Sequence, residues 1–93
     1  MEDYRAVLAA EPGFYFAHYN MGNVLAKMQN YHEASAAYSK ALEINPEFAE
    51  AYYNRGLTRL YLTDTVAACT DFSKAGQYGF ADVYPILRKS CGK

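Results

Sequence analysis

The chain has 93 residues, of which 52% are hydrophobic and 20% are charged, and its formal net charge is −1. This composition is that of one small folded domain, and it excludes a disordered chain. The scattered charges exclude a basic surface for nucleic acid, and no apolar run reaches the roughly 18–20 residues that a membrane-spanning helix needs.

Helical periodicity predicts about six helices and no strands, and an offset of 34 residues links them. In chain order the helices are expected at about 2–14, 14–28, 31–44, 47–62, 65–78 and 80–91. Residues 38–41 (YSKA) match residues 72–75 (FSKA), and residues 19–22 (YNMG) match residues 53–56 (YNRG). A fixed period of this length is typical of stacked helix pairs, which act through a surface rather than a catalytic centre.

Proline and short polar residues mark the expected helix starts. Pro12 and Pro46 are each expected to open a helix, because a missing N–H costs little in the first turn. Asn30 is expected to cap the helix over 31–44, with Glu33 completing a capping box. Asp64 is the expected cap of the helix over 65–78.

The last predicted helix contains a proline. Asp82 as its N-cap would place Pro85 in the first turn, where the ring is tolerated.

Two glycines in mid-helix positions indicate close helix packing. Gly22 and Gly56 are 34 residues apart, and each weakens its helix by about 1 kcal/mol relative to alanine. Tyr38 and Phe72, on the following helices, are expected to fill the space beside them.

These residues resemble the tetratricopeptide repeat family, whose 34-residue unit is a helix–turn–helix with an aromatic, small residues and a closing proline. The first repeat matches at His18, Met21, Gly22, Leu25, Ala34, Tyr38, Ala41 and Pro46. The second repeat matches at Tyr52, Arg55, Gly56, Arg59, Ala68, Phe72 and Ala75, with Phe80 at the proline position. The resemblance implies an all-α superhelix of stacked antiparallel helix pairs.

The whole chain, residues 1–93, is expected to form a single tetratricopeptide-like domain. Residues 15–48 and 49–82 form the two full repeats, residues 2–14 resemble the second helix of a truncated repeat, and residues 80–91 resemble a closing helix. We therefore expect further repeats before Met1 in the parent protein and Lys93 near its C-terminus.

The chain departs from the family at both turns inside the repeats, where Gln29 and Thr63 replace the usual glycine. A left-handed backbone there would carry some strain.

Arg55 and Arg59 also occupy inner positions where the family commonly has apolar residues. Their stems are expected to pack while the guanidinium groups pair with Asp71 or Asp64. The alternative is a functional anion site.

The first helices of successive repeats line the concave groove of such an array. The resemblance places a peptide-binding surface on their outward stripes and on the last helix, at Phe16, Tyr19, Asn20, Asn23, Lys27, Glu50, Tyr53, Asn54, Leu57, Tyr61, Tyr84 and Arg88. Exposed aromatic residues provide contact area at low entropic cost. The alternative is that these side chains pack against one another.

One branch of the family clamps the C-terminal carboxylates of its partners in this groove. Asn23, Asn54 and Arg88 match that clamp, but Tyr19 and Tyr84 stand at its lysine positions. Most of the charge assistance of such a clamp is therefore missing.

No constellation of residues indicates catalysis, a cofactor or a metal. His18 and His32 share no helix face and are expected to be structural or solvated. Cys69 reads as a small core residue and Cys91 as an exposed thiol, because two cysteines are too few for a disulfide framework and lack metal-site spacing.

The expected function is a non-catalytic scaffold that binds a peptide or protein segment in the groove. The alternative is a self-association module in which contacts between copies bury the aromatic groove. Tyr4, Val7 and Leu8 would also lack their usual cover and could join another copy as a weak homodimer. A degenerate carboxylate-clamp adaptor is a minor alternative. The compartment stays open, with a cytoplasmic location favoured by the lack of a signal or transmembrane segment.

Overall fold

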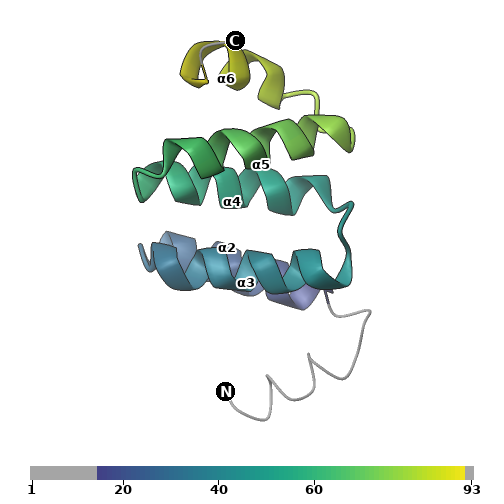
Figure 1. Cartoon of the computed structure of the whole chain (residues 1–93). Coiled ribbons are helices and arrows are strands. Elements are labelled where there is room, and N and C mark those ends of the chain that lie inside the picture. The colour runs from purple at the N-terminus through teal and green to yellow at the C-terminus, as the bar shows by residue number, and fades with distance from the viewer. Residues whose placement is uncertain (1–14, 92–93) are drawn as a thin grey trace.

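The computed structural model describes residues 15–91, which form five helices connected by short turns (Figure 1). The helices are α2 (Tyr15–Lys27), α3 (Tyr31–Ile44), α4 (Ala49–Tyr61), α5 (Thr65–Gln77) and α6 (Val83–Ser90). Within these residues there is no strand, which confirms the all-helical prediction. The helix expected over residues 2–14 lies outside the described part of the chain.

The helices stack as pairs. Helix α2 packs along α3, α4 packs along α5, and α3 joins the two pairs by contacting α4. In Figure 1 the stack runs from the α2–α3 pair through the α4–α5 pair to α6, which covers α5 at the far end. Because the turns inside the pairs are only a few residues long, the paired helices are antiparallel, as expected for helix–turn–helix repeats.

The two glycines allow the close packing that the sequence predicts. A Cβ atom on Gly22 would lie 2.6 Å from the ring of Tyr38, and one on Gly56 would lie 2.7 Å from the ring of Phe72. Both rings are almost completely buried. Glycine is therefore required because an aromatic ring occupies the space of its missing side chain.

The turns inside the two pairs have a left-handed backbone at a residue other than glycine. Gln29 has a φ of 65° and Thr63 a φ of 62°. The next residue closes each turn, with Asn30 N donating to Leu25 O at 2.9 Å and Asp64 N donating to Arg59 O at 2.9 Å. This is the α-helix C-cap geometry in which glycine is the usual residue.

The expected helix starts are only partly correct. Asp64 caps α5 by accepting a hydrogen bond from Ala67 N at 3.3 Å, as predicted. Asn30 is the N-cap of α3, but its side chain makes no capping hydrogen bond, so the predicted capping box is wrong. Asp82 is likewise the N-cap of α6 without a side-chain bond.

Pro46 does not open α4, contrary to the prediction, since α4 begins at Ala49. Phe48 N donates to Asn45 O at 3.2 Å, and Glu47 N donates to Asn45 Oδ1 at 3.3 Å. Pro46 thus lies at the second position of a β-turn, where its fixed φ is equally favourable. The Asn45 side chain stabilises this turn, and α4 therefore begins after the turn rather than at Pro46.

The structure corrects the expectation for both cysteines. Cys69 on α5 and Cys91 at the end of α6 form a disulfide with a Cα–Cα distance of 5.8 Å. Cys91 is therefore not a free thiol, and Cys69 is not simply a small core residue. Pro85 lies in the first turn of α6, as predicted.

Candidate functional site

A hollow of about 420 Å³ opens between the C-terminal halves of α2 and α4 and the first half of α3. Its lining combines aromatic rings, amides and one cation. The lining residues are Asn23, Ala26, Lys27, Tyr31, Tyr38, Asn54, Leu57, Thr58 and Tyr61.

Five of the twelve predicted groove residues line this hollow. They come from the two helices that the 34-residue period relates, and they are Asn23, Lys27, Asn54, Leu57 and Tyr61. Their presence in one concavity agrees with the predicted position of the groove, and binding there remains a prediction.

Three predicted aromatic groove residues outside the hollow, Phe16, Tyr19 and Tyr53, contact other rings of the protein, although Phe16 remains 55% exposed. The rings of Phe16 and Tyr19 lie against Phe48, with centroids at 5.4 and 4.8 Å. The ring of Tyr53 lies 4.7 Å from that of Phe80 and also contacts the core. These contacts correspond to the self-packing alternative for this part of the stripe.

The other predicted groove residues lie apart from the hollow. Tyr84 places its ring against the backbone position of Gly76, at the end of α5. Asn20, Glu50 and Arg88 are exposed on α2, α4 and α6.

A hydrogen-bond network fixes the amides of the hollow. Asn23 Oδ1 accepts from Tyr38 Oη at 2.5 Å and from Asn54 Nδ2 at 3.0 Å. Asn54 Nδ2 also donates to Tyr19 Oη at 3.0 Å. Within residues 15–91, Asn23 Nδ2 and Asn54 Oδ1 take no part in a side-chain hydrogen bond, so one donor group and one acceptor are free for a ligand.

Burial keeps the anchoring phenol of this network protonated. Desolvation, followed by the neighbouring Tyr19, raises the pKa of Tyr38 to about 12. Tyr38 Oη is therefore a hydrogen-bond donor at any physiological pH, and Asn23 Oδ1 is a constant acceptor for it. The orientation of both amides follows from this fixed donor.

An aromatic pair forms the outer wall of the hollow. The rings of Tyr31 and Tyr61 stack with centroids 4.7 Å apart and an interplanar angle of 4°. Tyr61 is 68% exposed, which is a large fraction for an aromatic residue. Lys27 is the one charged side chain among the lining residues.

Sequence reasoning missed four of the lining residues: Ala26, Tyr31, Tyr38 and Thr58. The spacing predicts only a packing role for Tyr38, whereas the structure places it in the lining with its hydroxyl bonded to Asn23. Tyr31 begins α3, whereas the predicted surface used only the first helix of each repeat. Its stacking on Tyr61 depends on how α3 lies beside α4, and no spacing in the sequence indicates it.

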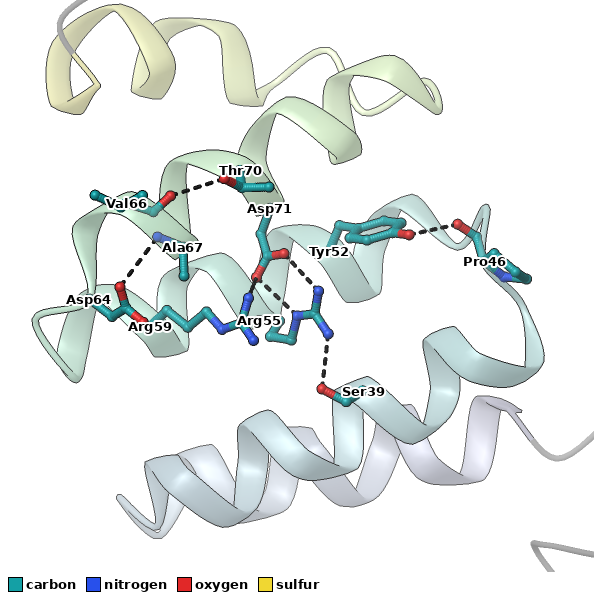
Figure 2. A network of polar contacts seen from close by, with 10 residues as sticks. All are labelled: Ser39, Pro46, Tyr52, Arg55, Arg59, Asp64, Val66, Ala67, Thr70 and Asp71. Atoms are coloured by element: carbon teal, nitrogen blue, oxygen red, sulfur yellow. Dashed lines mark hydrogen bonds and ion pairs between the residues drawn. The ribbon is translucent and has the colours of Figure 1, made fainter.

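A second polar cluster joins α3, α4 and α5 (Figure 2). Arg55 forms two hydrogen bonds with Asp71, from Nε to Oδ2 at 3.0 Å and from Nη2 to Oδ1 at 2.8 Å. Its Nη1 donates to Ser39 Oγ at 2.9 Å, and Arg59 Nη1 donates to Asp71 Oδ2 at 3.0 Å. Asp71 is 1% exposed, so this is a buried ion-pair cluster.

The cluster confirms Asp71 as the predicted partner of both arginines, while Asp64 serves as a helix cap instead. All three nitrogens of the Arg55 guanidinium already donate to the protein. The bond from Arg55 to Ser39 connects the second repeat to the first. Because all three Arg55 nitrogens are engaged, Arg55 has little capacity left to donate to a bound anion.

The two histidines differ in their surroundings. Burial, and next the charge of Lys40, lowers the pKa of His18, although Glu43 opposes the shift. His32 is exposed.

In the part of the chain that the structure describes, no group of three or more histidine, cysteine or carboxylate side chains could hold a metal ion. None of the described helices is long and apolar enough to span a membrane.

Comparisons with known proteins agree with this geometry. The model of the tetratricopeptide repeat family matches residues 22–60. A UDP-N-acetylglucosamine--peptide N-acetylglucosaminyltransferase from Giardia intestinalis is 38% identical over 63 residues, which are 68% of this chain and 4% of the transferase. Tetratricopeptide repeat protein 6 from Homo sapiens is 32% identical over 62 residues, which are 67% of this chain and 12% of that protein. The chain thus spans a small part of both relatives.

Proposed function

This chain carries tetratricopeptide repeats, and we propose that it is a non-catalytic interaction module that binds an extended protein segment in the hollow between α2 and α4. Repeats of this family are generally interaction scaffolds. The transferase match covers 4% of that enzyme, and we propose no transferase activity for this chain.

The observation that carries the proposal is the pair of free amide atoms in a fixed network. Asn23 Nδ2 can donate to a peptide carbonyl, and Asn54 Oδ1 can accept from a peptide N–H. Since Tyr38 and Tyr19 hold the amides in place, binding loses little side-chain entropy. An extended segment offers such donors and acceptors along its backbone.

The stacked tyrosine pair supplies the apolar part of the contact. Tyr31 and Tyr61 together form a rigid wall, with one face of Tyr61 open to solvent. Tyrosine is enriched among the residues that dominate binding energies, because a large ring is immobilised at low entropic cost.

A carboxylate-clamp mode is not proposed. The Tyr19 hydroxyl, at the position of a clamp lysine, accepts a hydrogen bond from Asn54. Arg88 lies on α6, away from the lining of the hollow. Among residues 15–91, Lys27 is then the single cation that lines the hollow.

The test is selection of a random peptide library on the immobilised chain, followed by fluorescence polarisation of a selected peptide. We expect Tyr61→Ala and Asn54→Ala each to weaken binding on the order of tenfold, the loss of one good contact. The matched control is Val66→Ala, which removes an exposed side chain outside the hollow and should leave affinity unchanged. Equal affinity of all three variants, or failure to select any peptide, would refute the proposal.

Light scattering tests the self-association alternative on the same proteins. A dimer that dissociates on Tyr61→Ala would identify the hollow as an interface between copies. A monomer across the concentration range supports a free hollow.

A further inference from the structure

The disulfide fastens the last helix at the end opposite to its main apolar anchor. Val83, at the start of α6, is completely buried in a cluster with Ala68, Phe72 and Ala75. Cys91 follows the last residue of α6 and is bonded to Cys69 on α5. The two attachments therefore hold opposite ends of α6.

Few other contacts hold the last turn of α6. Ile86 and Leu87 are half-buried against the same cluster, whereas Arg88, Lys89 and Ser90 are exposed. The Cys91 amide closes the helix by donating to Leu87 O at 3.0 Å. An isolated helix of eight residues is not stable in water, so the order of this turn depends on its attachments.

Cys69 and Cys91 are each partly exposed. Both cysteines line an open hollow of about 440 Å³ together with Thr65, Val66, Thr70, Ser73, Leu87 and Ser90. Within residues 15–91 both cysteines are in the disulfide, so no third thiol competes for exchange. A small dithiol can therefore reach the sulfur atoms without prior unfolding.

We propose that the Cys69–Cys91 disulfide is a reversible redox latch, whose reduction releases the last turn of α6 and leaves α2–α5 folded. This goes beyond the proposed peptide binding, since it concerns another face of the molecule. One thiolate of a dithiol attacks a cysteine sulfur, and the S–S bond breaks as a mixed disulfide forms. The cysteine that was not attacked leaves as a thiolate, and the second thiol then displaces the attacked cysteine from the mixed disulfide. The dithiol is thereby oxidised to its own disulfide, while Cys69 and Cys91 together gain two electrons and two protons.

The closing experiment uses the full chain. Intact mass after denaturation in iodoacetamide without reductant should show no alkylation, and after dithiothreitol treatment it should show alkylation of Cys69 and Cys91. Amide hydrogen exchange is then compared before and after reduction. We expect exchange in residues 87–91 to accelerate on the order of tenfold, with unchanged exchange in α2–α5.

The control is Cys69→Ser/Cys91→Ser, which should exchange like the reduced protein and should not respond to dithiothreitol. Alkylation of both cysteines before reduction would overturn the proposal. So would unchanged exchange after reduction, because α6 would then need no latch. Faster exchange throughout α2–α5 would overturn it as well, since the bond would then stabilise the whole domain. If the variant does not fold, the comparison of oxidised and reduced wild-type protein still decides.

Discussion

Removing the carboxylate of Asp71 tests how much the buried ion-pair cluster stabilises the fold. In Asp71→Ala, Arg55 and Arg59 both lose their carboxylate partner in a largely buried site. Removing one partner of a buried ion pair destabilises proteins by about 3–5 kcal/mol, because a buried charge is left uncompensated. The arginine side chains are 16% and 27% exposed and can regain part of their hydration. We therefore expect the lower end, about 3 kcal/mol.

Urea unfolding followed by circular dichroism at 222 nm measures this loss as a lower midpoint. In thermal unfolding of a domain of this size, 1 kcal/mol of stability corresponds to about 4–8 °C in Tm. The expected fall in Tm for Asp71→Ala is therefore about 12–24 °C. The control is Ser73→Ala, an exposed position on the same helix, which should change stability by less than about 0.5 kcal/mol.

A triple variant separates the unpaired charges from lost packing. Arg55→Met/Arg59→Met/Asp71→Leu replaces all three charged side chains of the cluster by apolar ones, and such replacements are often neutral. We expect it to be more stable than Asp71→Ala. A loss below about 1 kcal/mol for Asp71→Ala would mean that the cluster behaves as a surface ion pair, which refutes the reasoning. A triple variant as unstable as Asp71→Ala would assign the loss to packing.

Three further variants test the packing, the turns and the buried histidine. Gly56→Ala should lower stability by about 1 kcal/mol in urea unfolding, because overpacking against Phe72 outweighs the gain in helix propensity. Thr63→Gly should raise stability by about 0.5–1 kcal/mol in the same assay, since glycine relieves the left-handed backbone of a β-branched residue. The pKa of His18 is lowered in the folded state, so its contribution to stability is present above about pH 6.5 and is lost as the pH falls through the lowered pKa. Unfolding midpoints between pH 8 and pH 5 should therefore fall less steeply for His18→Gln, whereas His32→Gln, at an exposed position, should keep the wild-type slope.

The fold could be predicted because the same glycine–aromatic packing contact occurs in both repeats of the sequence. Gly22 with Tyr38 and Gly56 with Phe72 occur at one offset and have one geometry. Asp71 could be predicted as the arginine partner for a related reason, since a buried cation needs a carboxylate on the neighbouring helix.

The cysteine pair and the aromatic wall could not be predicted in this way. Cys91 lies beyond the second repeat, and its distance from Cys69 depends on the path through Gly79, whose φ is 109°. Tyr31 and Tyr61 come from helices that the period does not relate, and their stacking follows from the angle between α3 and α4. The disulfide and the tyrosine stack both depend on the tertiary arrangement of the helices, which the spacing of residues in the sequence does not indicate.

The hollow owes its character to the positions at which the two repeats differ. Asn23 and Leu57 are related by the offset of 34, as are Lys27 and Tyr61, yet one member of each pair is polar or charged and the other is apolar or aromatic. A hollow built from identical copies would present one chemistry along its length. In this one, α2 contributes the amide of Asn23 and the cation of Lys27, whereas α4 adds the apolar Leu57 and the aromatic Tyr61 to its own amide, Asn54. Peptide backbones need polar contacts and side chains need apolar ones. Under the proposed peptide binding, we therefore expect the divergence of the repeats to favour one segment in one orientation.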